Sequence, residues 1–409
     1  ARDGVTAAIR VARHAEVTGE ADLAARAFAL LARHADAEHR LLDADRAWQG
    51  ALRNLPEREA DRARALLGRA DARVHQQRAQ DAIRDAEAAI AIAIDRGERE
   101  LEVEARFALA TMLDLANDFE RSATEAGTAL ERVAAIDAPP KVRDAALFAE
   151  ARMSFRAQHF AEAVPKLREA VAAAHADANW DVEIAASLLL GPALVELREL
   201  DEAETLFAGV IAACAQRDDR FHQAAAYGNR AWLWSARGAT ERSAEDVRVL
   251  IQLAREVGAA TLERAGTYNL AEDRLWQGAH DEALQLARRS VAIQASAGDS
   301  TRWDRILLAR VLAAAGDTGE LRDVLATLVP EDLAADERTV VDLLTAAADE
   351  ADAARWDQLL ALTLEMTGAQ RLELLHLAAQ HGHLGATFRG SVADLVAGNP
   401  IWAPRAHEF

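Results

Sequence analysis

Residues 160–171 read FAEAVPKLREAV, residues 200–211 read LDEAETLFAGVI and residues 280–291 read HDEALQLARRSV. In each stretch a small residue is followed four positions later by an apolar residue, and three positions further on by another small or apolar residue. The first member of this pattern recurs at Ala44, Ala82, Ser122, Ala163, Ala203, Ser243, Ala283 and Leu321, with spacings of 38, 40, 41, 40, 40, 40 and 38 residues. Because a fixed period of about 20 to 50 residues is the signature of a repeat architecture, we predict a repeat array.

The composition narrows the fold class further. Gly (21) and Pro (8) together are 29 of 409 residues, about 7%, where average usage is about 12%. Ala, Leu, Glu and Arg dominate, and Tyr occurs only twice. These residues favour helices over strands, so we predict an all-α protein and exclude a disordered chain, a collagen and a β-sandwich.

Each period resolves into two amphipathic helices joined by a tight turn. The turns carry Gly238, Gly278, Gly316 or the pair Asn117-Asp118, which suit a positive φ at the end of a helix. Longer links between helix pairs carry proline, as at Pro56 and Pro330. The repeating unit is therefore a helix hairpin.

The repeat resembles the tetratricopeptide repeat (TPR). Leu67-Gly68 and Leu190-Gly191 match the Leu-Gly pair of that family's first helix, and Ala44, Trp48, Ala51 and Pro56 match the second half without a gap. The resemblance implies a right-handed α-solenoid. The period of about 40 departs from the family's usual 34 and is similar to longer variants in bacterial regulators. Pro192, inside a first helix, should cost a hydrogen bond or kink the helix.

The repeats divide the chain into three predicted segments. Residues 1–20 form the second helix of a truncated repeat, residues 21–330 an array of about eight helix pairs, and residues 331–409 an irregular helical capping region and tail. Further helices are expected near residues 333–349, 353–366, 369–381 and 386–397. Because the array begins in the middle of a repeat, we expect the chain to be a piece of a longer protein.

The charge balance bears on the class of partner. Lys and Arg number 47 and Asp and Glu 67, which gives a net charge of −20. This field repels phosphate backbones and anionic lipid, so nucleic acid and membrane are not expected as partners. A single cysteine, Cys214, and the lack of a long apolar stretch indicate a cytoplasmic protein.

No motif of catalysis is present in the sequence. It has no phosphate-binding loop, no His-Glu-x-x-His, no Gly-x-Ser-x-Gly and no calcium loop. We interpret Cys214 as a small buried hydrophobe, and His376, His381 and His383 as a solvated helix end that stops at Gly382. The sequence therefore predicts a protein that is not an enzyme, with no cofactor and no metal site.

The TPR resemblance also implies a binding surface. First helices line the concave wall of such arrays, and the fifth, sixth, ninth, twelfth and thirteenth positions point into it. Carried onto this sequence, the pattern selects as partner-binding residues Asn229, Trp232, Tyr268, Asn269, Glu272, Trp276 and Arg310, with Arg152 and Phe155 in a second patch. Trp303, near the start of the first helix that carries Arg310, is added to this set. In peptide-binding members an Asn at the sixth position bonds the ligand's main chain, and Arg310 at a ninth position could pair with a carboxylate. The alternative is that Trp232 and Trp276 only pack in the core.

These observations predict a non-catalytic module that binds an extended protein or peptide segment, or another domain of the same chain. The resemblance suggests the regulatory or sensor arm of a larger bacterial signalling protein. One alternative is a sensor of a small, for example sugar-like, molecule on the Trp-rich wall, and another is a pure scaffold or oligomerisation module. An enclosed pocket near Trp232, Trp276 and Trp303 would favour the small molecule, and an open groove the peptide.

Overall fold

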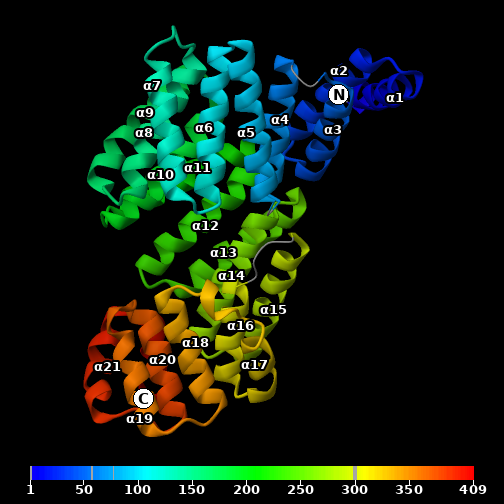
Figure 1. Cartoon of the computed structure of the whole chain (residues 1–409). Helices are drawn as coiled ribbons and strands as arrows, with labels where there is room; N and C mark the ends of the chain where they lie inside the picture. Colours follow the sequence, from blue (N-terminus) through cyan, green and yellow to red (C-terminus); the bar gives the residue numbers. More distant parts are fainter. Residues whose placement is uncertain (1, 57–58, 77, 298–301) are drawn as a thin grey trace. The chain divides into compact units, whose positions relative to one another are not determined.

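The computed structural model describes the chain except residues 1, 57–58, 77 and 298–301. The helices follow the predicted hairpin order (Figure 1). After α1 (Arg2–Thr18), the first helices of the pairs are α2 (Ala21–Ala37), α4 (Ala60–Val74), α6 (Arg99–Leu115), α8 (Pro140–Arg156), α10 (Trp180–Glu196), α12 (Arg220–Ala236), α14 (Ala260–Trp276) and α16 (Arg302–Ala315). The second helices are α3 (Leu41–Asn54), α5 (Ala79–Arg96), α7 (Phe119–Val133), α9 (Phe160–Ala176), α11 (Leu200–Gln216), α13 (Thr240–Val257), α15 (His280–Ala297) and α17 (Thr318–Leu325).

The small residue that marks each repeat lies in a second helix and is at most 5% exposed in every copy. Two glycines show why small residues are needed between paired helices. A Cβ atom on Gly68 would overlap the ring of Trp48, and one on Gly191 would overlap the ring of Phe207. The large ring of one helix thus fills the space that the glycine of a neighbouring helix leaves. The all-α solenoid predicted from the period is confirmed.

The turns also agree with the sequence. Asn117, Gly238, Gly278 and Gly316 all have a positive φ, between 63° and 80°. Pro192 does not end its helix, because α10 continues from Trp180 to Glu196.

None of the helices among the described residues combines the length and the apolar character that crossing a bilayer requires.

The chain forms two compact units. Unit 1 comprises residues 1–236 and 248–263, and unit 2 comprises residues 237–247 and 264–409. The predicted boundaries at residues 20 and 330 divide complete repeats from incomplete or irregular ones, which is a different division from that into compact units. These boundaries stay predictions.

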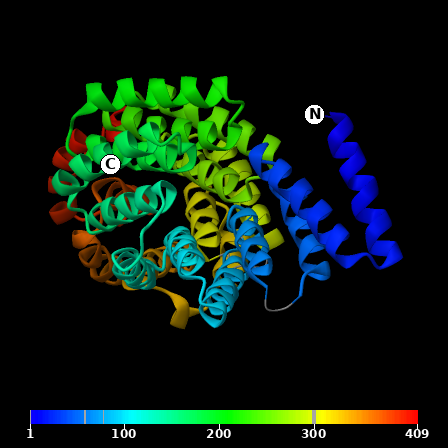
Figure 2. The same cartoon turned by 90° about the horizontal axis from the view of Figure 1, so that it is seen from above.

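In unit 1 each helix from α1 to α12 packs against the next, along a curved path in the colours from blue to green (Figure 2). The first helices α2, α4, α6, α8, α10 and α12 also contact one another in succession. No two successive second helices among the described residues of this unit pack equally closely. The first helices therefore form the inner wall of the curve, as the TPR resemblance implied.

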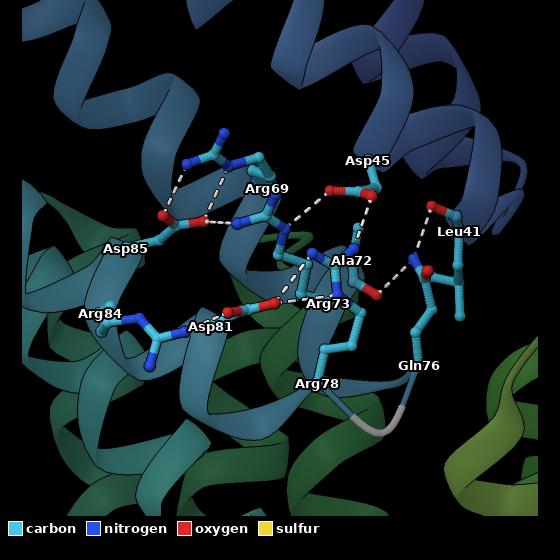
Figure 3. Close-up of polar contacts among 10 residues, drawn as sticks. All are labelled: Leu41, Asp45, Arg69, Ala72, Arg73, Gln76, Arg78, Asp81, Arg84 and Asp85. Atoms are coloured by element: carbon cyan, nitrogen blue, oxygen red, sulfur yellow. Dashed lines mark hydrogen bonds and ion pairs between the residues drawn. The ribbon is translucent and has the colours of Figure 1, made fainter. Parts of the chain in front are cut away.

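A buried ion network ties α3, α4 and α5 of unit 1 together (Figure 3). The guanidinium of Arg73 lies between the carboxylates of Asp45 and Asp85, with N–O distances of 2.8 Å to each. Arg69 and Arg78 complete the pairing, at 2.7 Å from Asp85 and 3.0 Å from Asp45. The carboxylates of Asp45 and Asp85 are thus each paired with two arginines, and the network serves packing.

Unit 2 has its own core, to which the C-terminal helices contribute. These are α18 (Ala335–Ala348), α19 (Ala353–Ala361), α20 (Gly368–Gln380) and α21 (Ala386–Gly398), with 3-10 turns η1 (Pro330–Asp332), η2 (Leu362–Glu365) and η3 (Pro400–Glu408). Trp356 and Trp402 are fully buried in this core. The expected helices of the cap exist within a few residues of their predicted ends, although that of residues 353–366 turns into a 3-10 helix after Ala361.

The cysteine and the three histidines near the C-terminus that the sequence singled out all lie in packed surroundings. Cys214 is fully buried, and burial raises the pKa of its thiol to about 12, which agrees with a buried hydrophobe. The interpretation of His376 as solvated is wrong, because its imidazole is buried and Nε2 lies 2.7 Å from Glu408 Oε2. His381 and His383 stack on Trp356 instead. The aromatic core of the cap, which the local sequence did not indicate, explains both arrangements.

Candidate functional site

Arginine stands at the ninth position of the first helix in both units, at Arg152 on α8 and at Arg310 on α16. Both were selected from the sequence as partner-binding residues. Their surroundings differ, so the two sites are described in turn.

In unit 1 the Arg152 side chain is only 5% exposed. Its Nη1 donates a hydrogen bond of 2.6 Å to Thr111 Oγ1 on the neighbouring first helix α6, and its guanidinium lies 5.5 Å from the ring centroid of Phe148. Burial lowers the pKa of Arg152, and the positive charge of Arg156 acts in the same direction. The nearby Asp114 carboxylate opposes these two effects.

Asp114 is not free to neutralise Arg152. Its two oxygens accept hydrogen bonds of 2.7 and 2.6 Å from Nε and Nη2 of Arg156. Arg156 also lies over the ring of Phe155, which in turn packs edge-on against Phe160 at 5.4 Å. The predicted second patch therefore contains one satisfied ion pair beside an arginine that has only a hydroxyl partner.

No carboxylate of the described residues lies within ion-pair distance of Arg152. Its remaining nitrogens are also not among the buried polar atoms that lack both a partner and access to solvent. A buried guanidinium with spare N–H groups binds a carboxylate through charge-assisted, often bidentate hydrogen bonds. We define Arg152, Thr111 and Phe148 as the Arg152 site.

In unit 2 the equivalent arginine is saturated. Arg310 donates from Nε and Nη2 to the two oxygens of Glu373, at 2.8 and 2.6 Å, and its Nη1 lies 2.6 Å from Glu272 Oε1. Burial lowers the pKa of Arg310, but the charges of Glu373 and Glu272 outweigh that effect and hold it well above the ordinary value. Trp276 Nε1 donates to the same Glu373, at 2.6 Å. Helix α20 of the cap thus supplies the carboxylate.

Beside Arg310 lies a cavity of about 330 Å³ between the first helices and the cap of unit 2. Its lining includes Tyr268, Trp303, Arg310, Met366, Gln370 and Glu373. Burial raises the pKa of the Tyr268 hydroxyl to about 12. The Trp303 ring is 45% exposed, and its indole N–H donates to Glu337. This cavity brings three of the sequence-selected residues together.

Glu272 and Trp276 bond the lining residues Arg310 and Glu373, whereas three other selected residues lie away from the cavity. Asn269 is exposed and does not line the cavity. Asn229 and Trp232 belong to α12 in unit 1, where Asn229 Nδ2 donates a bond of 2.7 Å to the main-chain oxygen of Leu188 and Trp232 is 42% exposed. The sequence did not indicate Thr111 or Glu373, because neither belongs to a motif and only packing brings each to its arginine.

No known protein family matches the sequence, and no curated protein matches it. Among solved structures, a Rap protein complexed with competence and sporulation factor is similar over 95% of this chain and 99% of that one, with 14% identity and a TM-score of 0.56. Naa15/Naa10 bound to HypK-THB matches with 12% identity, 96% and 76% coverage and a TM-score of 0.25. A circular tandem repeat protein matches with 16% identity, 100% and 97% coverage and a TM-score of 0.20. The fold similarity to the Rap protein agrees with a helical-repeat solenoid.

Proposed function

We propose that this chain is a non-catalytic TPR-like interaction module whose unit 1 binds an extended protein or peptide segment along its first helices. The observation that carries the proposal is the Arg152 site, where a buried guanidinium on the inner wall has a hydroxyl partner but no carboxylate. The segment would bring that carboxylate, as an acidic side chain or a free C-terminus. The Rap protein of similar fold was solved with a bound factor, which supports a role in recognition.

The remaining selected residues of unit 1 fit the same surface. Trp232 offers a flat, half-exposed ring. The ring of Phe155 contacts Arg156, whose ion pair with Asp114 lies beside Arg152. Aromatic residues and arginine are enriched in protein interfaces. A regulatory or sensor arm of a larger bacterial signalling protein, in the cytoplasm, is the role that we propose for such a module.

The test is affinity selection from a random peptide library with free C-termini, using the whole chain, Arg152→Gln and Arg168→Gln. Arg168 is a matched control because it lies on the second helix α9, half exposed, and pairs with exposed Glu202. Loss of a hydrogen bond to a charged group costs about 1.5 to 3 kcal/mol, so Arg152→Gln should bind selected peptides about 10 to 100 times more weakly. Arg168→Gln should bind them as the parent does.

Two outcomes would contradict this proposal. One is a selected peptide set without enrichment of acidic residues or terminal carboxylates. The other is equal binding by Arg152→Gln, with helicity of all variants verified by circular dichroism.

A second candidate function rests on the cavity of unit 2. Its volume of about 330 Å³ lies within the usual range for small-molecule sites, and Tyr268 and Trp303 offer the aromatic walls that sugars bind. A titration of tryptophan fluorescence with a panel of mono- and disaccharides tests it, with Trp303→Phe as the variant that should lose the signal. No saturable change with any sugar would exclude this class of ligand.

A further inference from the structure

A second cluster of functional side chains lies in unit 1, away from the Arg152 site. His39 occupies the turn between α2 and α3, whereas Asp219 and His222 lie at the start of α12, about 180 residues later in the sequence. The surrounding contacts also join these distant repeats. Thr261 donates to the main-chain oxygens of His75 and Val74, at 3.2 and 3.1 Å. The cluster thus stands where early and late repeats of unit 1 meet.

The two imidazoles face one carboxylate. His39 Nε2 lies 2.9 Å from Asp219 Oδ1, and His222 Nδ1 lies 2.8 Å from Asp219 Oδ2. One ligand atom from each residue can be chosen so that all three lie within 4.8 Å of one another. Asp219 is 3% exposed, while both histidines are about one-fifth exposed, so the cluster is reached from solvent past the imidazoles.

The Asp219 carboxylate also accepts two hydrogen bonds that do not come from the imidazole nitrogens. Trp180 Nε1 donates to Asp219 Oδ2 at 2.8 Å, and the main-chain N–H of His222 donates to Asp219 Oδ1 at 3.1 Å. The ring of Phe221 packs against the imidazoles of His39 and His222, with centroid distances of 6.0 and 5.0 Å. Such outer hydrogen bonds and apolar walls are what orient the ligands of protein metal sites.

We propose that His39, Asp219 and His222 form a binding site for one divalent transition metal of the Zn²⁺ class. Two imidazole nitrogens and a carboxylate oxygen are a ligand set that this class of metal prefers. His39 Nε2 and His222 Nδ1 must be unprotonated to bind the cation, so each neutral ring then carries its single proton on its other nitrogen, and any second ring proton is released to solvent. Three protein ligands leave a fourth position for water or for a group of a partner.

A metal held jointly by the turn before α3 and the start of α12 links repeats that are far apart in sequence. Binding to the folded state alone stabilises that state, so metal should raise the thermal stability of unit 1.

The experiment uses the untagged, chelator-dialysed full chain and Co²⁺ as the probe, followed by visible absorption and by displacement with Zn²⁺. We expect one Co²⁺ per chain with the d–d bands of a low-coordinate site. His39→Gln and His222→Gln should each weaken binding at least about tenfold, whereas His175→Gln, an exposed histidine on α9, should leave it unchanged.

Two results would overturn the site: no saturable Co²⁺ binding, or equal binding by the His39→Gln, His222→Gln double variant. X-ray absorption of the Zn²⁺ complex of the parent chain keeps the test valid if a variant does not fold. A first shell with two imidazoles supports the proposal, and a shell without imidazole refutes it.

Discussion

Arg152 in unit 1 and Arg310 in unit 2 occupy the same position of two different repeats, yet they have different surroundings. Arg310 is held by Glu373 and Glu272, whereas the one hydrogen-bond partner of the Arg152 side chain within the part of the chain that the structure describes is the hydroxyl of Thr111. Their exposures, 6% and 5%, are nearly equal, so burial does not distinguish them. What differs is the set of carboxylates, since in unit 2 the cap helix α20 supplies Glu373 and the preceding first helix α14 supplies Glu272. An arginine at the same repeat position thus pairs with the protein's own C-terminal helix α20 in unit 2 and bonds a hydroxyl of a neighbouring first helix in unit 1.

The first prediction concerns the saturated arginine and carries the largest effect. Arg310→Leu leaves Glu272 and Glu373 buried without their cation, which typically costs about 3 to 5 kcal/mol. Peptide-resolved hydrogen exchange should show the loss of protection in residues 264–409. The Arg310→Leu, Glu373→Leu double variant should recover part of it. Unchanged protection in the single variant would show that the ion pair contributes nothing to unit 2.

The second prediction concerns Asp273 of unit 2, whose carboxyl lies beside the carboxylate of Glu272. Burial and the adjacent Glu272 raise the pKa of Asp273 to about 6. Because the folded state then holds the proton more tightly, the stability that this group contributes is full below about pH 4 and is lost as the pH rises through about 6. Asp273→Asn should therefore stabilise unit 2 by up to about 2 kcal/mol at pH 8, after allowance for partial solvent exposure.

Urea unfolding of the parent and of Asp273→Asn, at pH 4 and at pH 8, measures this difference. An equal effect of the substitution at the two pH values would contradict the assigned charge state.

The third prediction concerns a variant that gives Arg152 a carboxylate partner, as Arg310 has in unit 2. Thr111→Asp places a carboxylate where the hydroxyl now accepts the bond from Arg152. We expect a gain of about 1 kcal/mol in the stability of unit 1, and at least about a tenfold loss of affinity for the peptides that the parent selects. Calorimetry and fluorescence polarisation measure the two effects. Retained affinity would mean that the ligand's carboxylate does not bind at Arg152.

The smallest effect is expected for Arg152→Leu. The substitution removes one hydrogen bond to Thr111 and orphans no carboxylate, so unit 1 should change in stability by less than about 1 kcal/mol. Hydrogen exchange over residues 99–156, compared with that of Arg310→Leu over unit 2, gives the contrast directly. A loss as large as that of Arg310→Leu would make Arg152 a structural residue and end the comparison.

Much of the fold could be predicted because its determinants are local. The small residue near every fortieth position, the positive φ at Gly278 and Asn117, and the helices after Pro330 all follow from short-range pattern. The site could be predicted only in part. Register selected Arg152, Arg310 and Tyr268, but it did not distinguish an arginine that has a carboxylate from one that lacks it among the described residues.

The sequence by itself determined the helix hairpins and their period, because periodicity and turn residues act within one repeat, and its resemblance to the TPR implied that the first helices line the inner wall. Tertiary structure decided which side chains on that wall are already paired. Glu373 reaches Arg310 from 63 positions away, and His39 meets Asp219 across 180. Such pairs depend on how the array curves and where its cap docks, which is the sum of many small packing angles that no single repeat encodes.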